Sequence, residues 1–197
     1  MSEETNPQRI AQAVVMGASA GAVEALTAIL PKLSRTFPLP IMVVVHLPAD
    51  KKSFMAELFR AKCPITVREA DDKEPIEKGT VYFAPPDYHL LVETNHSLSL
   101  SSEEPVLYSR PSIDLLFETA ADAYGKGLLG VILTGANSDG AKGLKAVVKA
   151  GGTAIVQEPQ GASSPTMPKA ALQACPDALV MSLEQIANYL QEVTANA

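Results

Sequence analysis

The chain is poor in cysteine, in aromatic residues and in positive charge. Its 197 residues include 2 cysteines, no tryptophan and 5% aromatic side chains. Cys63 and Cys175 lack a second cysteine or a histidine at metal-ligand spacing, which predicts reduced, structural thiols and no metal site. Acidic residues outnumber basic ones by 22 to 16, so the net charge is −6, and no basic run offers a site for nucleic acid. We expect neither a cofactor nor a nucleic-acid partner.

Long apolar runs are also missing. The first dozen residues are polar, unlike a signal peptide, and no apolar run approaches the roughly 20 residues that span a bilayer. A hydrophobic content of 47% and a charged content of 19% are typical of a globular domain with a buried core. The sequence therefore predicts a cytoplasmic protein that is not membrane-embedded. We expect residues 1–12 to form a disordered or extended tail and residues 13–193 to form a single domain.

Strand-like and helix-like patterns alternate along the chain. Strands are predicted at 13–16, 41–45, 65–69, 130–133, 153–156 and 178–181, and helices at 23–33, 51–61, 112–124, 141–150, 167–174 and 183–193. Three further short strands, at 80–84, 89–93 and 97–100, are spaced as in an antiparallel hairpin or meander. The pattern predicts an α/β fold, a doubly wound, mostly parallel sheet with helices on both faces and a short antiparallel hairpin addition.

The first predicted strand leads into small residues around one serine. Residues 17–21 read G-A-S-A-G, with the serine at Ser19, and a helical pattern follows at 23–33. A G-x-S-x-G turn between a strand and a helix is typical of a nucleophile elbow, in which the serine hydroxyl stands clear of the fold. Short turns of this composition also cradle phosphate in dinucleotide-binding domains or serve only as structure. All three interpretations remain open on this segment alone.

A histidine and an aspartate follow two other predicted strands. His46 comes directly after 41–45, and Asp139 follows 130–133 through a short loop. Ligands bind beyond the carboxyl ends of the strands in doubly wound sheets, so Ser19, His46 and Asp139 can meet there. A serine nucleophile needs an imidazole to take its proton, and that imidazole needs an orienting carboxylate. The alternatives are a structural role for His46 and a cap of the helix 141–150 for Asp139.

Several other polar residues have two interpretations each. His89 and His96 are rival bases, but His96 lies in a solvated turn and His89 is placed to anchor a loop. Arg110 is a candidate for contact with a substrate carboxylate or carbonyl, or else an exposed helix flank. Asp114 fits a first-turn residue favoured by the helix dipole better than a catalytic acid. The loop 163–168 either overhangs the site or is a plain connection broken by proline.

These motifs, in this order, resemble the catalytic domain of the bacterial chemotaxis-receptor protein-glutamate methylesterases, the CheB type. The resemblance runs from about residue 13 to about residue 190. It rests on the segments 17–21, 45–48, 81–92, 109–117 and 133–135 with 139–141, and it extends to 167–171. It implies hydrolysis of glutamate γ-methyl esters on receptor signalling helices with release of methanol, and deamidation of particular receptor glutamines.

The resemblance also implies residue roles. Carried over by motif, Ser19 is the nucleophile, His46 the general base and Asp139 the orienting carboxylate. The backbone N–H of Ala20, at the helix start, is a candidate oxyanion donor. Arg110 and Met167, which lie in matched segments, are candidates for substrate contact. Methylated chemoreceptor or signalling-protein helices are the partners that the family implies.

The chain departs from the family pattern near the serine and before the aspartate. Ala20 stands where the family commonly has threonine and Ala22 where it commonly has glycine. Residues 136–138 read A-N-S in place of the usual Met-Gly-x. These departures favour an alternative function, a weakly active or non-catalytic receptor-docking module on the same fold. A nucleotide-binding Rossmann domain is a third interpretation, disfavoured because its second strand usually ends in an acidic residue rather than in His46.

Family members usually carry an N-terminal receiver domain that restrains the catalytic domain. No such domain precedes residue 13 in this sequence. We therefore expect that this control is absent or that a separate regulatory receiver protein supplies it.

Overall fold

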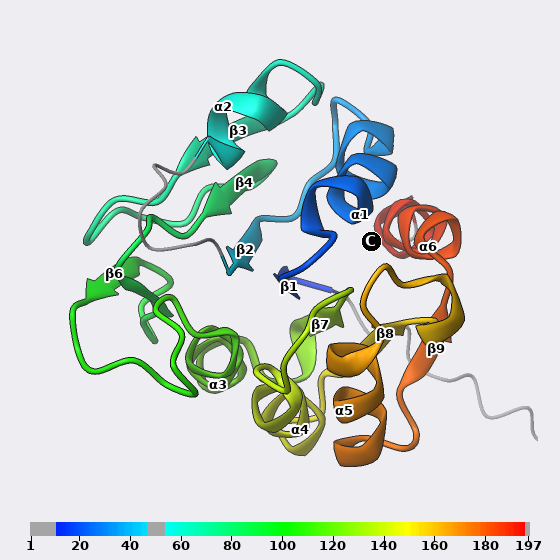
Figure 1. Ribbon diagram of the computed structural model, residues 1–197. Helices are drawn as coiled ribbons and strands as arrows, with labels where there is room; N and C mark the ends of the chain where they lie inside the picture. Colours follow the sequence, from blue (N-terminus) through cyan, green and yellow to red (C-terminus); the bar gives the residue numbers. More distant parts are fainter. Residues whose placement is uncertain (1–10, 47–53, 196–197) are drawn as a thin grey trace, which may run out of the picture.

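The computed structural model describes residues 11–46 and 54–195, and a seven-stranded parallel sheet forms its centre (Figure 1). The strand order is β3-β4-β2-β1-β7-β8-β9. The strands are β1 Ala13–Ala18, β2 Ile41–Val45, β3 Thr66–Glu69, β4 Thr80–Phe83, β7 Leu128–Ile132, β8 Thr153–Gln157 and β9 Leu179–Met181. Every residue of β1, β2 and β7 is buried, because helices cover both faces of the sheet. The predicted doubly wound fold is confirmed.

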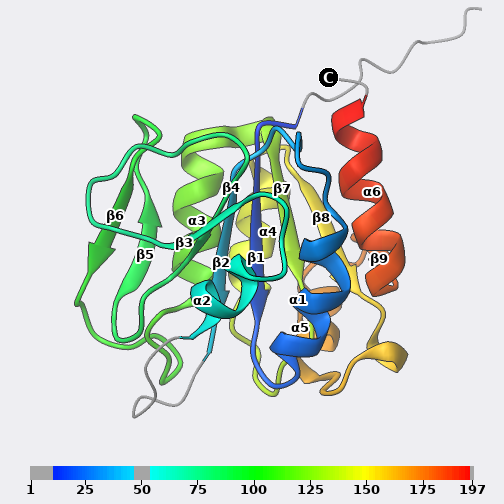
Figure 2. The ribbon, with the colours of Figure 1, turned by 90° about the horizontal axis from the view of Figure 1, so that it is seen from above.

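The helices divide between the two faces (Figure 2). One core contains buried residues of α1, α2 and α6, and a second core contains those of α3, α4 and α5. The helices are α1 Ala22–Ile29, α2 Met55–Arg60, α3 Ile113–Tyr124, α4 Ala141–Lys149, α5 Thr166–Ala174 and α6 Leu183–Ala195. Short 3₁₀ turns lie at η1 Leu30–Lys32, η2 Gly125–Gly127 and η3 Pro159–Gly161. Burial of these apolar faces supplies the main favourable term in folding.

The antiparallel addition is smaller than the sequence predicts. Strands β5 His89–Val92 and β6 Leu98–Ser101 form a two-stranded antiparallel sheet, with His89 opposite Ser101. The segment predicted at 80–84 does not join them, because β4 pairs in parallel with both β2 and β3. All four residues of β4 are buried. Such a strand needs cover on both faces, which the central sheet provides.

Element boundaries shift by a few residues. The predicted helix 23–33 ends as α1 at Ile29 and continues as the 3₁₀ turn η1, in which Pro31 lies. The predicted helix 51–61 is seen as α2, and its residues 51–53 lie outside the described residues, as do residues 1–10 of the predicted tail. Over residues 11–46 and 54–195, no helix is long and apolar enough to cross a membrane.

The sheet brings three strand ends to one edge. β1 lies between β2 and β7, and all three run in parallel, so the loops that follow them lie at the same edge (Figure 2). The register pairs Ala18 with Val45, which makes Ser19 and His46 the next residues along neighbouring strands. The His46 N–H donates to the Ala18 carbonyl at 3.1 Å, so this alignment continues past the strand ends.

Candidate active site

The turn that carries Ser19 leads from β1 into α1. Gly21 is the N-cap of α1 and has a φ of 85°, a left-handed conformation that glycine adopts without strain. A Cβ at Gly21 would also lie 2.7 Å from the Cβ of Ser163, so the loop around Ser163 packs directly over the elbow. This contact agrees with the interpretation of 163–168 as a loop that overhangs the site.

Thr134 hydrogen-bonds the turn that carries Ser19. It lies two residues beyond the end of β7. Its carbonyl accepts the Ser19 N–H at 2.9 Å, and its Oγ1 donates to the Ala20 carbonyl at 2.8 Å. The Thr134 N–H donates in turn to Oε1 of the buried Gln157 at 2.8 Å. The sequence analysis missed both residues. A polar glutamine directly after the apolar residues 154–156 of β8 was the available signal, because a buried amide needs partners.

His46 and Asp139 lie in direct contact. The distance from His46 Nε2 to Asp139 Oδ2 is 2.8 Å, and the carboxylate is fully buried. Asp139 also accepts the backbone N–H groups of Ile113 at 2.7 Å and Asp114 at 2.9 Å, and the Ser112 hydroxyl at 3.2 Å. Burial by itself would raise the pKa of Asp139, but the hydrogen bonds from His46, Asp114 and Ile113 outweigh it, and the pKa is lowered. Asp139 is therefore a carboxylate that can orient His46.

The other ring nitrogen of His46 is an acceptor. Because Nε2 donates to Asp139, Nδ1 of the neutral imidazole carries the lone pair. Asn137 Oδ1 accepts the Asp139 N–H at 3.0 Å, which turns its amide nitrogen toward Nδ1 at 3.3 Å. Ser19 is half-buried, and its hydroxyl forms no hydrogen bond with any described residue. Ser19, the candidate nucleophile, thus follows the strand next to the one that His46 follows, but it is not hydrogen-bonded to His46.

An open hollow of about 440 Å³ adjoins Ser19. Its lining consists of Ser19, Gly21, Ala22, Val23, Glu24 and Val45. Within the described part of the chain, the backbone N–H groups of Ala20 and Gly21 have no hydrogen-bond partner. Free N–H groups at a helix start attract negative charge. The hollow can therefore receive a carbonyl group whose oxygen becomes negative during attack by Ser19.

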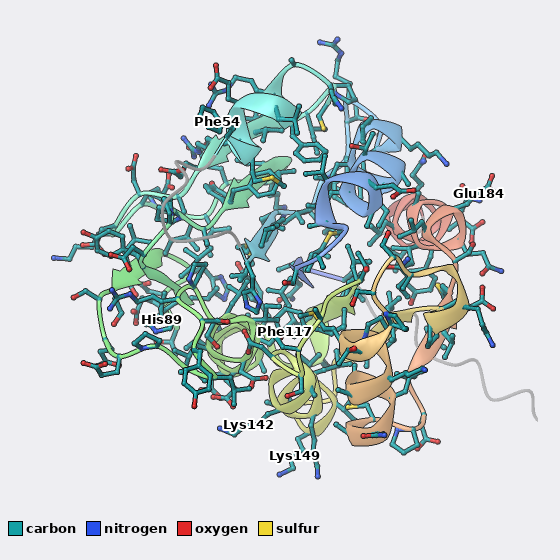
Figure 3. The ribbon with its side chains drawn as sticks, viewed as in Figure 1. Phe54, His89, Phe117, Lys142, Lys149 and Glu184 are labelled. Carbon is teal, nitrogen blue, oxygen red and sulfur yellow. The ribbon has the colours of Figure 1, made fainter. Side chains whose placement is uncertain are left out.

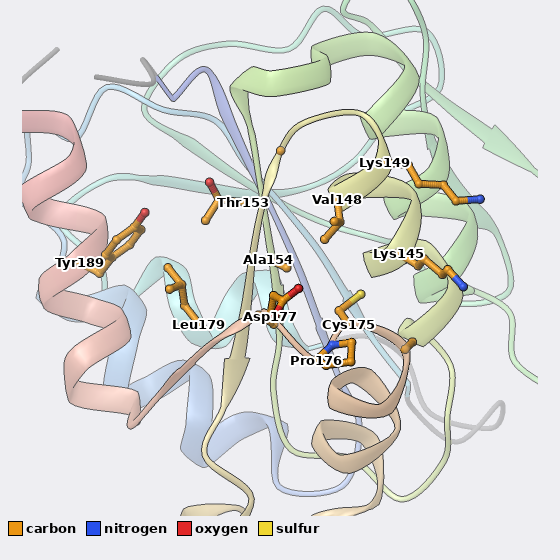
Figure 4. Close-up of a pocket in the computed structure, with 13 residues that line it drawn as sticks. Lys145, Val148, Lys149, Thr153, Ala154, Cys175, Pro176, Asp177, Leu179 and Tyr189 are labelled. Atoms are coloured by element: carbon orange, nitrogen blue, oxygen red, sulfur yellow. The ribbon is translucent and has the colours of Figure 1, made fainter. Parts of the chain in front are cut away.

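A larger cavity, about 510 Å³, lies elsewhere (Figure 4). Its lining includes Thr153, the first residue of β8, so it opens at the sheet edge opposite to the one that carries Ser19. Figure 4 shows the ammonium ends of Lys145 and Lys149 pointing away from Thr153. Burial raises the pKa of Cys175 in this lining, which keeps the thiol protonated. The larger cavity lacks a nucleophile with a base and is not the candidate site.

Arg110 and Met167 both have structural contacts. Arg110 donates to the Asp87 carboxylate at 2.6 Å and to the carbonyls of Ser102 and Glu103 at 2.9 and 3.1 Å. Met167 is 1% exposed, and its side chain packs on Gly135, where a Cβ would lie 2.5 Å from the methionine methyl group. Arg110 thereby closes its own loop and Met167 fills the core. Substrate contact by either side chain stays a prediction.

The rival histidines are anchored away from Ser19. His89 is fully buried, and its Nδ1 accepts the Ser112 N–H at 3.1 Å while Nε2 donates to the Glu104 carbonyl at 3.0 Å. This agrees with the interpretation of His89 as a loop anchor. His96 lies exposed in a turn, stacks on Tyr124 with ring centroids 4.5 Å apart and donates to the Ala123 carbonyl. Among the described residues, neither ring forms a hydrogen bond with a serine hydroxyl or a carboxylate.

Comparison with known proteins shows a family match over most of the chain. The family model of the CheB methylesterase domain matches residues 14–190. A relative from Leptospira interrogans is 46% identical over 185 residues, which cover 94% of this chain and 96% of the relative. A protein-glutamate methylesterase/protein-glutamine glutaminase from Rhodospirillum rubrum is 35% identical over 182 residues, 90% of this chain but 47% of that protein. The chain therefore spans about half the length of that relative.

A solved structure has the same architecture. The Thermotoga maritima CheB methylesterase catalytic domain is 33% identical to this chain and superposes with a TM-score of 0.88. The match covers 93% of this chain and 98% of that domain.

Proposed function

We propose a reaction for this chain from the premise that it belongs to the CheB methylesterase family, as the domain match and the relatives show. It hydrolyses glutamate γ-methyl esters on chemoreceptor or related signalling proteins and releases methanol. The observation that carries this proposal is the buried Asp139–His46 pair, which makes Nδ1 of His46 the acceptor nitrogen that can act as a base at the strand end beside Ser19.

The reaction begins with proton transfer. Nδ1 of His46 takes the hydroxyl proton of Ser19 as Oγ attacks the ester carbonyl carbon, and Asp139 stabilises the resulting imidazolium. The carbonyl oxygen becomes an oxyanion that accepts hydrogen bonds from the N–H groups of Ala20 and Gly21. When the tetrahedral intermediate collapses, the C–O bond to the methoxy group breaks and His46 protonates the leaving methanol. Ser19 then carries the glutamyl acyl group.

Water completes the cycle by the reverse route. His46 takes a proton from water, the hydroxide attacks the acyl carbon, and the Ser19 oxygen leaves with the proton from His46. The products are a glutamate carboxylate and free enzyme. The same sequence on a glutamine side chain releases ammonia, and the name of the Rhodospirillum rubrum relative, which includes protein-glutamine glutaminase, supports this second activity.

The departures near Ser19 leave the backbone groups of the site in place. Ala20 lacks the side chain that the family commonly has there, yet its carbonyl is bonded to Thr134 and its N–H is free. The oxyanion donors are backbone atoms, so an alanine supplies them as well as a threonine does. This favours an active enzyme over a docking module without catalysis. A separate receiver protein remains the proposed source of regulation.

A methanol-release assay tests the proposal. A receptor signalling fragment carrying radiolabelled methyl esters is incubated with the wild type and with Ser19→Ala, and volatile label is counted. We expect release by the wild type and a loss of about 10⁴-fold or more in the variant, as in other serine triads. Equal release by both proteins would contradict the triad. No release by either, from a fragment that a proven methylesterase cleaves, would support the docking module.

A further inference from the structure

We propose that Asp114 is a positioning residue that holds the Asp139 carboxylate, and through it His46, by an exchange of helix caps between α3 and α4. This inference rests on the proposed function, because it concerns the same base. Asp114 lies in the first turn of α3 and is 5% exposed. It does not touch the hollow beside Ser19, whose lining comes from α1, the elbow and β2.

Asp139 binds the start of α3, the helix that contains Asp114. Asp114 in turn binds the start of α4, the helix that follows Asp139. Asp139, in the loop before α4, accepts the N–H groups of Ile113 and Asp114 at the start of α3. Asp114 accepts the N–H of Gly140 at 3.0 Å and that of Gly143 at 2.7 Å, at the start of α4. Helix starts present N–H groups without partners inside the helix. Each carboxylate therefore accepts N–H groups at the start of the neighbouring helix. The N-cap of α4 is Gly140, which has no side chain, whereas α3 also has its own cap, the Ser112 hydroxyl.

The exchange fixes the atom that orients the base. Gly140 directly follows Asp139, so the bond from its N–H to Asp114 restrains the backbone that carries the carboxylate. Asp139 Oδ2, which accepts the Ile113 N–H, is also the oxygen that contacts His46 Nε2. A displacement of Gly140 relative to α3 therefore changes the angle at which His46 is held. Catalytic geometry tolerates errors of about 0.5 Å at most.

The close packing of α3 against α4 makes this exchange of caps possible. A Cβ at Gly143 would lie 2.9 Å from the Cα of Asp114, so a glycine there lets α4 approach close enough for the 2.7 Å bond. Phe117 is fully buried on the inner side of this helix pair, and Lys142 pairs with Glu118 at 3.0 Å on the outer side (Figure 3). The helices are thus held together on both sides of Asp114, which places its carboxylate against the start of α4.

Three substitutions at Asp114 separate positioning from general stability. Asp114→Ala removes the acceptor, Asp114→Asn keeps one oxygen in the same place, and Asp114→Ser offers a shorter acceptor that cannot reach both N–H groups. The matched control is Ser182→Ala, which removes the hydroxyl that accepts the Gln185 N–H at 3.2 Å at the start of α6, after β9 at the end of the strand order and three strands along from β1. Thermal unfolding of each variant is measured together with kcat and KM for the methylated receptor fragment.

We expect the alanine variant to lose at least about tenfold in kcat with less than about a twofold change in KM, because positioning acts on the transition state. Asp114→Asn restores kcat to within about threefold of the wild type, and the serine variant lies between the two. Ser182→Ala lowers the unfolding temperature without changing kcat. A tenfold loss in Asp114→Asn as well, or an unchanged kcat in Asp114→Ala with only a lower unfolding temperature, would overturn the proposal.

A readout without substrate keeps this test separate from the proposed reaction. In protein with ¹⁵N-labelled histidine, the Nε2–H signal of His46 reports its hydrogen bond to Asp139. We expect that signal to shift and exchange faster with water in Asp114→Ala and Asp114→Ser and to stay as in the wild type in Asp114→Asn. An unshifted signal in both truncated variants contradicts the proposal even if the wild type hydrolyses no ester. A wild type without esterase activity but with the expected shifts would instead contradict the proposed reaction alone.

Discussion

Asp139 and Ser19 lie beyond the ends of the neighbouring strands β7 and β1, yet their surroundings differ. Asp139 is fully buried and accepts hydrogen bonds from a histidine ring, a hydroxyl and two backbone N–H groups. Ser19 is half-buried, borders an open hollow, and its hydroxyl has no partner among the described residues. One half of the proposed triad is held in place before substrate arrives, and the other half is left open.

This difference separates two requirements of the proposed reaction, orientation of the base and access to Ser19. Orientation of the base depends on a buried network, because only a fixed carboxylate sets the His46 tautomer. In the proposed reaction, a side chain of another protein must reach Ser19, and this agrees with its open surroundings. The Ser19–His46 bond can form when substrate enters, since catalytic hydrogen bonds are often loose in free enzymes. Substitutions on the two sides should therefore differ in their effects on stability more than in their effects on catalysis.

The sharpest contrast is between Ser19→Ala and Asp139→Ala. Both should lower kcat by about 10⁴-fold or more, because each removes a proposed triad member. Only Asp139→Ala should also lower the free energy of unfolding, by about 3–5 kcal/mol, since it leaves buried N–H groups unpaired. Ser19→Ala should change that free energy by less than about 0.5 kcal/mol. Methanol release and urea unfolding give the two measurements, and equal loss of stability in both variants would contradict the comparison.

The pH dependence of the free energy of unfolding tests the buried half of the proposed triad, Asp139 with His46. Burial raises the pKa of Asp114 to about 6, with the charge of Asp139 adding to this and the bonds from Gly143 and Gly140 opposing it. The ordinary value is about 3.9, so ionisation of Asp114 costs folded-state stability as pH rises from about 4 to about 6. Asp114→Asn cannot ionise and should avoid that loss.

As pH rises over this range, Asp114→Asn should thus become more stable relative to the wild type, and the difference in the free energy of unfolding should grow by on the order of 2 kcal/mol. The lowered pKa of Asp139 acts in the opposite sense, because its contribution is lost as pH falls, and it is common to both proteins. Urea unfolding at several pH values from about 4 to 7 measures the difference. A difference that does not vary with pH would show that Asp114 titrates at its ordinary value.

The Thr134 hydroxyl supports the turn that carries Ser19, so it should matter for the open half of the triad. Thr134→Val keeps the shape but removes the donor to the Ala20 carbonyl and the acceptor of the Ser164 N–H. We expect about a tenfold lower kcat and about 1–2 kcal/mol less stability, because the elbow loses its support. Thr153→Val, the same change at the amino edge of β8, is the control. Equal kcat values in both variants would show that the elbow does not depend on the Thr134 hydroxyl.

The smallest expected effect concerns the contact between the Asn137 amide and the His46 ring. The Asn137 amide donates to His46 Nδ1 at 3.3 Å, the nitrogen that must accept the Ser19 proton. Asn137→Ser removes this competing donor and retains a side-chain oxygen for the Asp139 N–H, so kcat/KM should rise about two- to fivefold. Asn95→Ser is the control, because Asn95 accepts the N–H of Ser97 two residues on in the same way. A lower kcat/KM in Asn137→Ser would mean that the amide assists His46 instead.

The order of strands and helices was predictable because their patterns are local. The run 41–45 was predicted and observed with the same bounds, since five consecutive buried apolar residues suit only a strand covered on both faces. The partner of β4 was not predictable in this way. Its short length and the turn residues after it resemble a hairpin strand, and only the packing of β2 against it decides the parallel pairing.

The site was predictable in its chemistry but not in its connections. Strand-end positions singled out Ser19, His46 and Asp139, and the structure places Asp139 and His46 in contact across 93 positions of the sequence. Thr134 and Gln157 were missed because their roles depend on hydrogen bonds between separate loops. Asp114 was interpreted as favoured by its own helix dipole, whereas its carboxylate caps the neighbouring helix α4.

The amino-acid sequence by itself determined the alternation of strands and helices, the residue types at each strand end and the resemblance to a family. These follow from periodicity and motif, which need no knowledge of distant contacts. The tertiary structure alone decided that Nε2 of His46 faces Asp139, that the Ser19 hydroxyl has no partner within residues 11–46 and 54–195, and that Asp114 and Asp139 exchange helix caps. Such choices depend on the ångström-scale approach of elements far apart in the chain, which packing of the whole core sets.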